Sequence, residues 1–500
     1  MGQYPSLGLS KWQVMYDIYE NAVSVGTIVV NDGGNEEMAK DHKQGKRGLN
    51  IIIVGCGKVG ASLTEQLYKE GHDITLVDRS SDRLQALTDM YDVMGIVGNG
   101  ASYKIQREAG IDNADLMIAV TDSDELNLLC CTVAKRVGDC AAIARVRTPD
   151  YSDEASYLKE KLGLAMIINP EMEAANEITH VLSLPAALGV NSFAHGQAQM
   201  IRFKIPENNR LDGQKVMAMA RNISGDVLVC AVEREKHVFI PDGNFELHQG
   251  DVVSFIAASK AAKEFFERIG MPNKPVHNTM IIGGGKAAYY LGKMLLDMGI
   301  EVKIIEMDRK RCRELSVLLP QATIINGDGT DEELLKEEEI AYVDSLVPLT
   351  GIDEENVLLA LHAREVSDAK VITKVNRNAF HNLIDKLDLG SVIYPKYITA
   401  EAIVAYVRAK QASMDSSNVE TIYHMFDSRA EAIEFNVSAS SRVTDVPLKD
   451  LNTKDNLLIA CINRYGKIII PGGMDCIQAG DTVVIVTTHT GFQNIEDILR

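Results

Sequence analysis

The stretch Ile51-Ile-Ile-Val-Gly-Cys-Gly-Lys-Val-Gly60 decides the fold of this 500-residue chain. Its first four residues predict an apolar strand, and the glycines that follow open a helix, which is the setting that a dinucleotide-binding turn requires. In such a turn Gly55 permits the tight bend, Gly57 lets the backbone approach a pyrophosphate, and Gly60 allows close packing of helix on strand. The helix N-terminus presents free N–H groups and a partial positive charge to the phosphates. A glycine turn with a purely structural role is the alternative.

A carboxylate stands where the sugar of a bound dinucleotide would lie. Asp78 follows Gly57 by 21 residues and closes the second predicted strand, so it can accept hydrogen bonds from both ribose hydroxyls. An acid at this position disfavours a 2′-phosphate, which predicts NAD(H) rather than NADP(H), although the adjacent Arg79 weakens the preference. Ala61 occupies the place where a P-loop needs its phosphate-binding lysine, so ATP hydrolysis is not predicted.

Further polar residues fall at the ends of two later predicted strands. Thr121 and Asp122 close the fourth strand, and Arg145 closes the fifth. Doubly wound sheets hold their ligands at the carboxyl ends of the strands. Thr121 and Asp122 are therefore candidate ligand contacts, and Arg145 can reach a phosphate. The alternatives are that Thr121 only caps a helix and that Arg145 only pairs with an acid.

The whole pattern occurs twice, which identifies a tandem duplication. The stretch Met280-Ile-Ile-Gly-Gly-Gly-Lys-Ala-Ala288 repeats the glycine turn at an offset of 228 residues. Later matches keep this offset or exceed it by one or two residues, so the copies stay in register to the C-terminus. Matched pairs are Asp78 and Glu306, Thr121 and Thr350, Asn127 and Asn356, Arg145 and Lys374, and the Gly-Asp turns that begin at Gly250 and Gly480.

The second copy carries a second candidate site, with Glu306 again 21 residues after Gly285. It differs at Ala288, which stands where the third glycine would be, and alanine is tolerated at that position. Three interpretations stay open for this site. It binds NAD(H) more weakly, it binds another adenine nucleotide such as ATP or ADP, or it is a degenerate pocket.

The order of the predicted segments indicates the fold class. Short Ile- and Val-rich segments alternate with longer helical ones in the first part of each copy, which predicts a parallel sheet covered by helices on both faces. The predicted fold is α/β, with two Rossmann-like doubly wound parallel-sheet domains, each followed by a small α+β domain. The predicted boundaries are 1–48 for a disordered extension, 49–170 and 277–394 for the Rossmann domains, 171–194 and 395–427 for crossover helices, and 195–270 and 428–500 for the small domains.

The composition argues against several classes of function. The apolar fraction of 46% and the charged fraction of 24% are those of a folded protein, and the net charge of −19 opposes binding to nucleic acid. Apolar runs are strand-sized, far short of a membrane span, and no export signal is recognisable, so a cytoplasmic location is expected. The eight cysteines contain no C-x-x-C pair and the eleven histidines are scattered. Neither a metal site nor a catalytic residue is predicted.

Three further motifs resemble the TrkA family, the cytoplasmic regulatory subunit of bacterial and archaeal Trk potassium uptake systems. They are Leu76-Val-Asp-Arg79, Ala119-Val-Thr-Asp-Ser-Asp-Glu125 followed by Asn127, and Ile143-Ala-Arg-Val-Arg-Thr-Pro-Asp150. With the glycine turn, the resemblance spans residues 49–500. It implies that each half is an RCK-type (KTN) N-terminal domain plus an RCK C-terminal domain. It also implies a homo-oligomeric ring that lies beneath an integral-membrane potassium channel or transporter subunit and gates it in response to NAD(H) or ATP, without catalysis.

The resemblance also implies two sets of nucleotide contacts. The first set is Gly55, Cys56, Gly57, Lys58, Val59, Gly60, Asp78, Thr121, Asp122 and Arg145, and the second is Gly283, Gly284, Gly285, Lys286, Ala287, Glu306, Thr350 and Lys374. The second set departs from the family pattern, because Ala288 replaces a glycine, Pro348 interrupts the predicted fourth strand, and Gly351 stands where the first copy has Asp122. Two alternatives remain: an NAD-dependent oxidoreductase with duplicated Rossmann domains, and a nucleotide sensor of another cation transporter.

Overall fold

A computed structural model of the chain describes residues 48–222, 227–271, 274–376, 384, 387, 389–413, 419–426 and 428–500. The disordered extension predicted for residues 1–48 lies outside the described residues, apart from Gly48. Within the described part of the chain, no helix is both long and apolar enough to cross a membrane.

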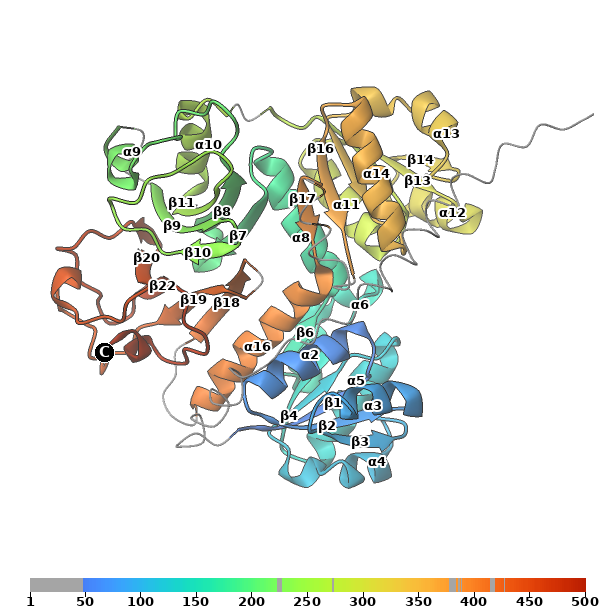
Figure 1. Cartoon of the computed structure of the whole chain (residues 1–500). Coiled ribbons are helices and arrows are strands. Elements are labelled where there is room, and N and C mark those ends of the chain that lie inside the picture. The colour runs from blue at the N-terminus through green and yellow to red at the C-terminus, as the bar shows by residue number, and fades with distance from the viewer. Residues whose placement is uncertain are drawn as a thin grey trace, which may run out of the picture. The chain divides into compact units, whose positions relative to one another are not determined.

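The first copy begins with a six-stranded parallel sheet in the order β3-β2-β1-β4-β5-β6, which is the Rossmann order predicted for it. The strands are β1 (Asn50–Val54), β2 (Asp73–Asp78), β3 (Met94–Val97), β4 (Leu116–Ala119), β5 (Ala141–Arg145) and β6 (Met166–Ile168). Helices pack around this sheet (Figure 1). Because both faces are covered, β1 is a continuous apolar run in which Ile51, Ile52 and Ile53 are all buried.

The helices of this domain begin where the sequence provides a start signal. They are α2 (Lys58–Lys69), α3 (Ser81–Thr88), α4 (Tyr103–Glu108), α5 (Asp124–Val137), α6 (Pro149–Ser152) and α7 (Ala155–Leu162). Helix α2 starts directly after the glycine turn. At the start of α5, the Ser123 hydroxyl accepts a hydrogen bond from the Leu126 amide at 3.1 Å, as an N-cap does.

The second copy repeats this domain, with the sheet order β14-β13-β12-β15-β16-β17. Its elements are β12 (Asn278–Ile282), α11 (Lys286–Asp297), β13 (Glu301–Glu306), α12 (Arg309–Leu318), β14 (Thr323–Asn326), α13 (Glu332–Glu337), β15 (Ser345–Pro348), α14 (Asp353–Val366), β16 (Lys370–Lys374) and β17 (Ser391–Ile393). The prediction that Pro348 interrupts its strand is wrong, because Pro348 is the last residue of β15 and pairs with Ile282. A proline lacks an N–H, so a strand tolerates it best at an edge or an end.

Each small domain contains a five-stranded antiparallel sheet, and the two sheets share one strand order. The first contains β7 (Gly189–Phe193), β8 (Ala198–Lys204), α9 (Val216–Asn222), β9 (Val227–Arg234), β10 (His237–Phe239), β11 (Val252–Ala257) and α10 (Ser259–Arg268), and the second β18 (Val419–Met425), β19 (Ala430–Asn436), β20 (Leu457–Arg464), β21 (Lys467–Ile469) and β22 (Thr482–Thr487). The repeated Gly-Asp turns have a structural role. Asp251 accepts two hydrogen bonds from Arg234 at 2.7 Å, and Asp481 accepts two from Arg464 at 2.9 and 2.7 Å.

The crossover segments contain more than the predicted helices. Helix α8 (Pro170–Ser183) is followed by β7 within the predicted segment 171–194, and α16 (Pro395–Ser413) is followed by β18 within 395–427. Each of these strands lies at the edge of its small sheet. The helices are therefore shorter than the predicted segments, and the small domains begin earlier along the chain.

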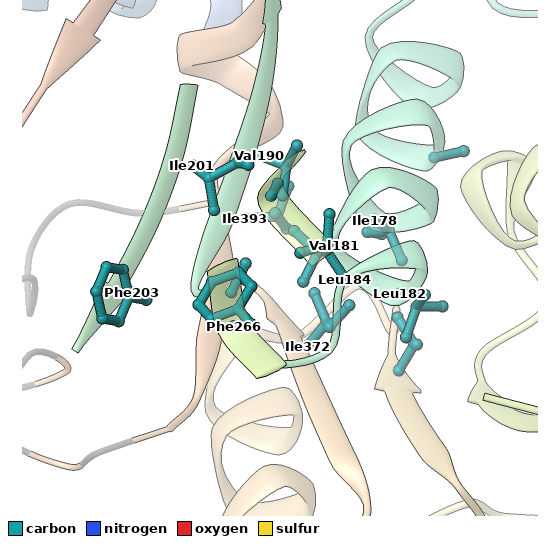
Figure 2. Close-up of a cluster of buried hydrophobic side chains, with 14 of the residues drawn as sticks. Ile178, Val181, Leu182, Leu184, Val190, Ile201, Phe203, Phe266, Ile372 and Ile393 are labelled. Atoms are coloured by element: carbon teal, nitrogen blue, oxygen red, sulfur yellow. The ribbon is translucent and has the colours of Figure 1, made fainter. Parts of the chain in front are cut away.

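Helix α8, which follows the first Rossmann domain, packs into the core of the second. Its residues Ile178, Val181 and Leu182 belong to one buried cluster with Ile372 of β16 and Ile393 of β17, as Figure 2 shows. The same cluster contains the apolar face of α11, against which α8 packs. It continues into the first small domain, where the Phe203 and Phe266 rings lie edge to face.

Helix α16, which follows the second Rossmann domain, packs on the first in the same way. Its residues Ile403, Val404 and Val407 share a buried cluster with the first sheet and with α2, along which α16 lies. The crossover helices are thus exchanged between the two copies. Each Rossmann domain therefore contacts the helix that leads into the small domain of the other copy.

A buried ionic cluster fixes this exchange on one side of the molecule. Arg408 of α16 is 2% exposed and bonds Glu70, the C-terminal cap of α2, at 2.9 Å through its Nε. The same guanidinium donates two hydrogen bonds of 3.1 Å to Glu431 of β19. His424 of β18 lies 3.4 Å from Glu431 and 3.6 Å from Glu401 of α16. The cluster therefore links a Rossmann helix, a crossover helix and a small domain.

The cluster predicts a pH dependence of stability. Burial lowers the pKa of His424, but Glu401 and Glu431 outweigh it and raise the value from 6.5 to about 9. Because the pKa of His424 is raised in the folded chain, its protonated form stabilises the fold. This contribution is complete below pH 6.5 and is lost as the pH rises through 9. We expect the melting temperature followed by circular dichroism to fall across that window, and to fall less in His424→Gln. An identical alkaline decline in the variant would refute the assignment.

At acidic pH, the stability that Glu431 contributes changes in the opposite direction. Burial raises the pKa of Glu431, but hydrogen bonds and charges from His424 and Arg408 bring it down from 4.5 to about 2. Its contribution to stability is therefore present above pH 4.5 and is lost as the pH falls towards 2.

Candidate nucleotide-binding site

The three glycines of the first turn are required for three different reasons. Gly55 has φ +104°, and a Cβ there would lie 2.9 Å from the amide nitrogen of Thr121. At Gly60 a Cβ would lie 1.9 Å from the carbonyl oxygen of Gly55, so in this copy a side chain requires α2 to shift away from the turn, whereas the second copy has the buried Ala288 at the matched position. A Cβ at Gly57 would meet nothing within 4 Å. Gly57 caps α2 and leaves open space at its N-terminus, where an anion would be favoured.

Two alanine substitutions separate these roles. Gly60→Ala is expected to destabilise the first Rossmann domain by about 3 kcal/mol, because backbone overlap forces α2 out of place. Gly57→Ala has room and should cost less than about 1 kcal/mol. Native-state hydrogen exchange of the β1 amides in the full chain measures the loss of stability in each variant. Equal costs for the two variants would show that the close contact at Gly60 is unimportant.

A cavity of about 290 Å³ opens at the carboxyl ends of β1, β2 and β4. It is lined by Val54, Gly55, Gly57, Val77, Asp78, Arg79, Arg83, Gly98, Gly100, Val120, Thr121, Asp122, Ser123 and Leu126. Among the predicted contacts, Gly55, Gly57, Asp78, Thr121 and Asp122 line it, whereas Cys56, Lys58, Val59, Gly60 and Arg145 lie outside its lining. The cavity occupies the strand-order reversal between β1 and β4, where open α/β sheets bind ligands.

Asp78 holds the glycine turn in shape. Its Oδ2 accepts a hydrogen bond from the Cys56 amide at 2.6 Å, and its Oδ1 accepts one from the Ser80 amide at 2.8 Å. The carboxylate therefore stands at the cavity with its orientation fixed and with lone pairs left for hydroxyl donors. The neighbouring Cys56 is inert, because burial, assisted by Asp78, raises the pKa of its thiol to about 12.

Asn127 fixes the ends of β4 and β5, a role that the sequence analysis missed. Its Oδ1 accepts hydrogen bonds from the Thr121 amide at 2.8 Å and the Thr121 hydroxyl at 2.7 Å. Its Nδ2 donates to the carbonyl oxygens of Thr121 at 3.1 Å and Arg145 at 2.9 Å. Asn356 repeats this arrangement with Thr350 and Lys374. The recurrence of asparagine in both copies was the available signal.

Arg145 is engaged within the protein. It is 8% exposed, its guanidinium donates to the Thr121 carbonyl oxygen, and it lies 3.5 Å from the Asp122 carboxylate. Burial and then the charge of Arg147 lower its pKa. Arg145 thus positions two residues that line the cavity.

The second turn repeats the geometry of the first. Gly283 has φ +98°, Gly285 caps α11 beside open space, and Glu306 accepts hydrogen bonds from the Gly284 amide at 2.5 Å and the Asp308 amide at 2.7 Å. Ala287 and Ala288 are both buried. The second copy therefore keeps the turn and the acid in the arrangement seen in the first.

Two lysines of the second predicted set of nucleotide contacts are bonded to other groups of the protein. Lys286 donates to the Thr148 hydroxyl at 3.0 Å and lies 3.9 Å from Asp124, so it reaches the first Rossmann domain beside α5. Lys374 donates to the Leu349 carbonyl oxygen at 2.9 Å, and burial lowers its pKa to about 8. The start of α11 is thus tied to the domain that holds the first cavity.

The cavity lining includes the glycine turn, the carboxylates of Asp78 and Asp122, and the guanidiniums of Arg79 and Arg83. No cysteine, histidine, lysine or tyrosine belongs to the residues that line it. Across the described residues, no group of three or more acidic, histidine or cysteine side chains is arranged to hold a metal ion. Backbone N–H groups at a helix N-terminus beside a carboxylate suit a diphosphate joined to a ribose.

The fold and site together define a class: a tandem protein of two Rossmann-type nucleotide-binding folds, each continued through a crossover helix into a small antiparallel domain. The TrkA-N domain family matches residues 51–170 and 279–395, and the TrkA-C domain family matches residues 200–270 and 432–500. The chain belongs to the TrkA family.

Named relatives match over most of their length. The Trk system potassium uptake protein TrkA of Haemophilus influenzae is 32% identical over 441 residues, 87% of this chain and 95% of that protein. A TrkA homolog of Methanosarcina mazei is 30% identical over 462 residues, 90% of this chain and 100% of that protein.

Solved structures share the fold at low identity. The GsuK channel aligns with a TM-score of 0.60 at 14% identity over 92% of this chain and 80% of that chain. The GsuK channel bound to NAD aligns with a TM-score of 0.59 at 15% identity over 91% of this chain and 80% of that chain.

Proposed function

We propose that this chain is the nucleotide-binding regulatory subunit of a Trk-type potassium uptake system, and that it gates an integral-membrane potassium channel or transporter subunit without catalysing a reaction. It works in the cytoplasm, at the inner face of the membrane, as a homo-oligomeric ring. The observation that carries the proposal is the exchange of α8 and α16 between the two copies. This exchange makes the shape of each half depend on the Rossmann domain of the other.

The ligand of the first crevice is NAD(H). Its diphosphate lies at the N-terminus of α2 against Gly55 and Gly57, and its ribose hydroxyls bond Asp78. A match in fold to a channel described as bound to NAD supports this choice. The second crevice, around Gly283–Gly285 and Glu306, takes NAD(H), ATP or ADP.

Binding becomes regulation through helix α2. This helix starts at the glycine turn and ends at Glu70, whose carboxylate bonds Arg408 of α16. A nucleotide that moves α2 therefore displaces α16 and the second small domain with it. A ligand changes such an equilibrium only by the difference in its affinity for the two states.

Ring assembly is supported by exposed apolar side chains at matched positions. Leu129 of α5 is 52% exposed, and Leu358 of α14, its counterpart in the second copy, is 66% exposed. The proposed ring would bury these two leucines in contacts between chains.

The test is potassium flux in cells that contain the membrane partner, with Gly57→Asp compared against Gly57→Ala. The aspartate fits the open space but places a carboxylate where the diphosphate binds, so we expect NADH binding to the first crevice to fall at least 100-fold, roughly the effect of losing one charged contact and gaining one repulsion. Flux should lose its nucleotide response in Gly57→Asp, whereas Gly57→Ala, which adds a methyl group without a charge at the same place, should weaken the response less. An unchanged response in Gly57→Asp rejects the proposal, as does turnover of bound NADH.

A further inference from the structure

We infer that the first crevice also accepts an adenine dinucleotide that carries a 2′-phosphate, of the NADP(H) type, and that Arg79 and Arg83 are the residues that admit it. The inference depends on the proposed function of this crevice and adds its ligand specificity. It assigns to the second crevice a preference for ligands with a free 2′-hydroxyl.

The first observation is that both guanidiniums are available to a ligand. Arg79 and Arg83 line the same cavity as Asp78, and both are exposed. Within the described residues, neither guanidinium has a hydrogen-bond or ion-pair partner, and the one bond of Arg83 is from its backbone amide to the Ser80 hydroxyl. An unpaired guanidinium beside a cavity is suited to a phosphate, which it can bind through two parallel hydrogen bonds.

The second observation is that the other copy offers neither group to a ligand. Met307 stands at the position of Arg79, and Arg311 stands at the position of Arg83. Arg311 is already engaged, because its Nε donates to the Gly284 carbonyl oxygen at 2.7 Å and its Nη1 donates to Glu314 at 3.1 Å. The first copy has Ala86 where the second has Glu314. Arg83 therefore has no carboxylate at this position, three residues later in its own helix, to pair with.

The position fits a 2′-phosphate. The residue that ends the second strand faces the ribose hydroxyls, and arginines just beyond it are the groups that accommodate a 2′-phosphate. An acid alone rejects that phosphate by repulsion. Here Asp78 already accepts two backbone hydrogen bonds, from Cys56 and Ser80, and two free cations stand beside it. The repulsion is offset in the first crevice, whereas in the second Met307 replaces one cation and Arg311 is bonded to Gly284 and Glu314.

The test is calorimetric titration of NADH and NADPH into the purified full chain. The wild-type protein should bind both dinucleotides in the first crevice. Arg79→Met with Arg83→Ala, which copies Met307 and removes the second cation, should weaken NADPH binding about 30-fold or more, as expected for one or two lost charge-assisted hydrogen bonds. NADH binding should change less than about threefold, which also reports that the variant folds. Arg79→Lys with Arg83→Lys keeps the charge and should retain most of the NADPH affinity.

Three results overturn the inference. NADH binding without NADPH binding in the wild type shows that Asp78 dominates the specificity. An equal loss of both dinucleotides in the Met/Ala variant shows that the arginines contact the adenine or diphosphate that the two ligands share. If neither dinucleotide binds, the proposed function fails together with the inference, which distinguishes that case from the first two.

Discussion

Replacing Arg408 with methionine is expected to destabilise the contact between α2, α16 and the second small domain by about 3–5 kcal/mol, the usual cost of removing one partner from a buried ionic group. Arg408 is 2% exposed, and its guanidinium serves both Glu70 and Glu431. Without it, two carboxylates remain in a site with little water and repel one another. The expected measurement is a lower thermal midpoint, with increased hydrogen exchange concentrated in α16 and β19.

The molecule supplies its own control for this prediction. At the equivalent positions of the other half, Met298 caps α11, Ser183 ends α8, and Gln199 lies on β8. An uncharged set therefore fits the same architecture. The triple variant Glu70→Met, Arg408→Ser, Glu431→Gln should recover much of the stability that Arg408→Met loses, because all three members of the Arg408 ion pairs are removed together and His424 keeps Glu401 as its partner. A triple variant less stable than the single one would contradict this account.

Replacing Asn127 with alanine should destabilise the first Rossmann domain by about 2–4 kcal/mol, because each buried polar group left without a partner costs about 1–3 kcal/mol. Asn127 is fully buried, and the amide and carbonyl groups of Thr121 and the carbonyl of Arg145 depend on it. Since Thr121 lines the cavity, NADH binding to the first crevice should weaken as well.

The matched control is Asn356→Ala, which removes the same hydrogen bonds in the second copy. It should raise the hydrogen exchange of β15 and β16 but leave the affinity of the first crevice within about twofold. If both variants weaken the first crevice equally, Asn127 acts on global stability and not on the local position of Thr121.

The fold was predictable because its signals are local and occur twice. The run from Ile51 to Gly60 contains a strand, a turn and a helix start within ten residues, and a duplicate of the pattern in the second copy excludes coincidence. The edge strands β7 and β18 were missed, because they lie in the segments that were assigned to crossover helices. Such strands are short or only half covered, so their side chains carry weak alternation.

The parts of the site that escaped prediction depend on contacts between distant segments. Glu70, Arg408 and Glu431 look like ordinary surface charges in sequence, and only the exchange of crossover helices buries them together. Lys286 matched the pattern of a phosphate contact, yet it bonds Thr148 of the other domain. The proposed role of Arg83 depends on Ala86, which stands where the second copy has Glu314, and only the structure shows that Glu314 bonds Arg311.

The central claim is that an adenine dinucleotide binds across the carboxyl edge of the first sheet and thereby moves α2. A structure of the full chain solved with NADH tests it most directly. The account predicts the diphosphate beside Gly57 at the start of α2, the ribose on Asp78, and α16 displaced relative to the ligand-free chain. An empty first crevice at saturating NADH, or an occupied one with α2 and α16 unmoved, would contradict it.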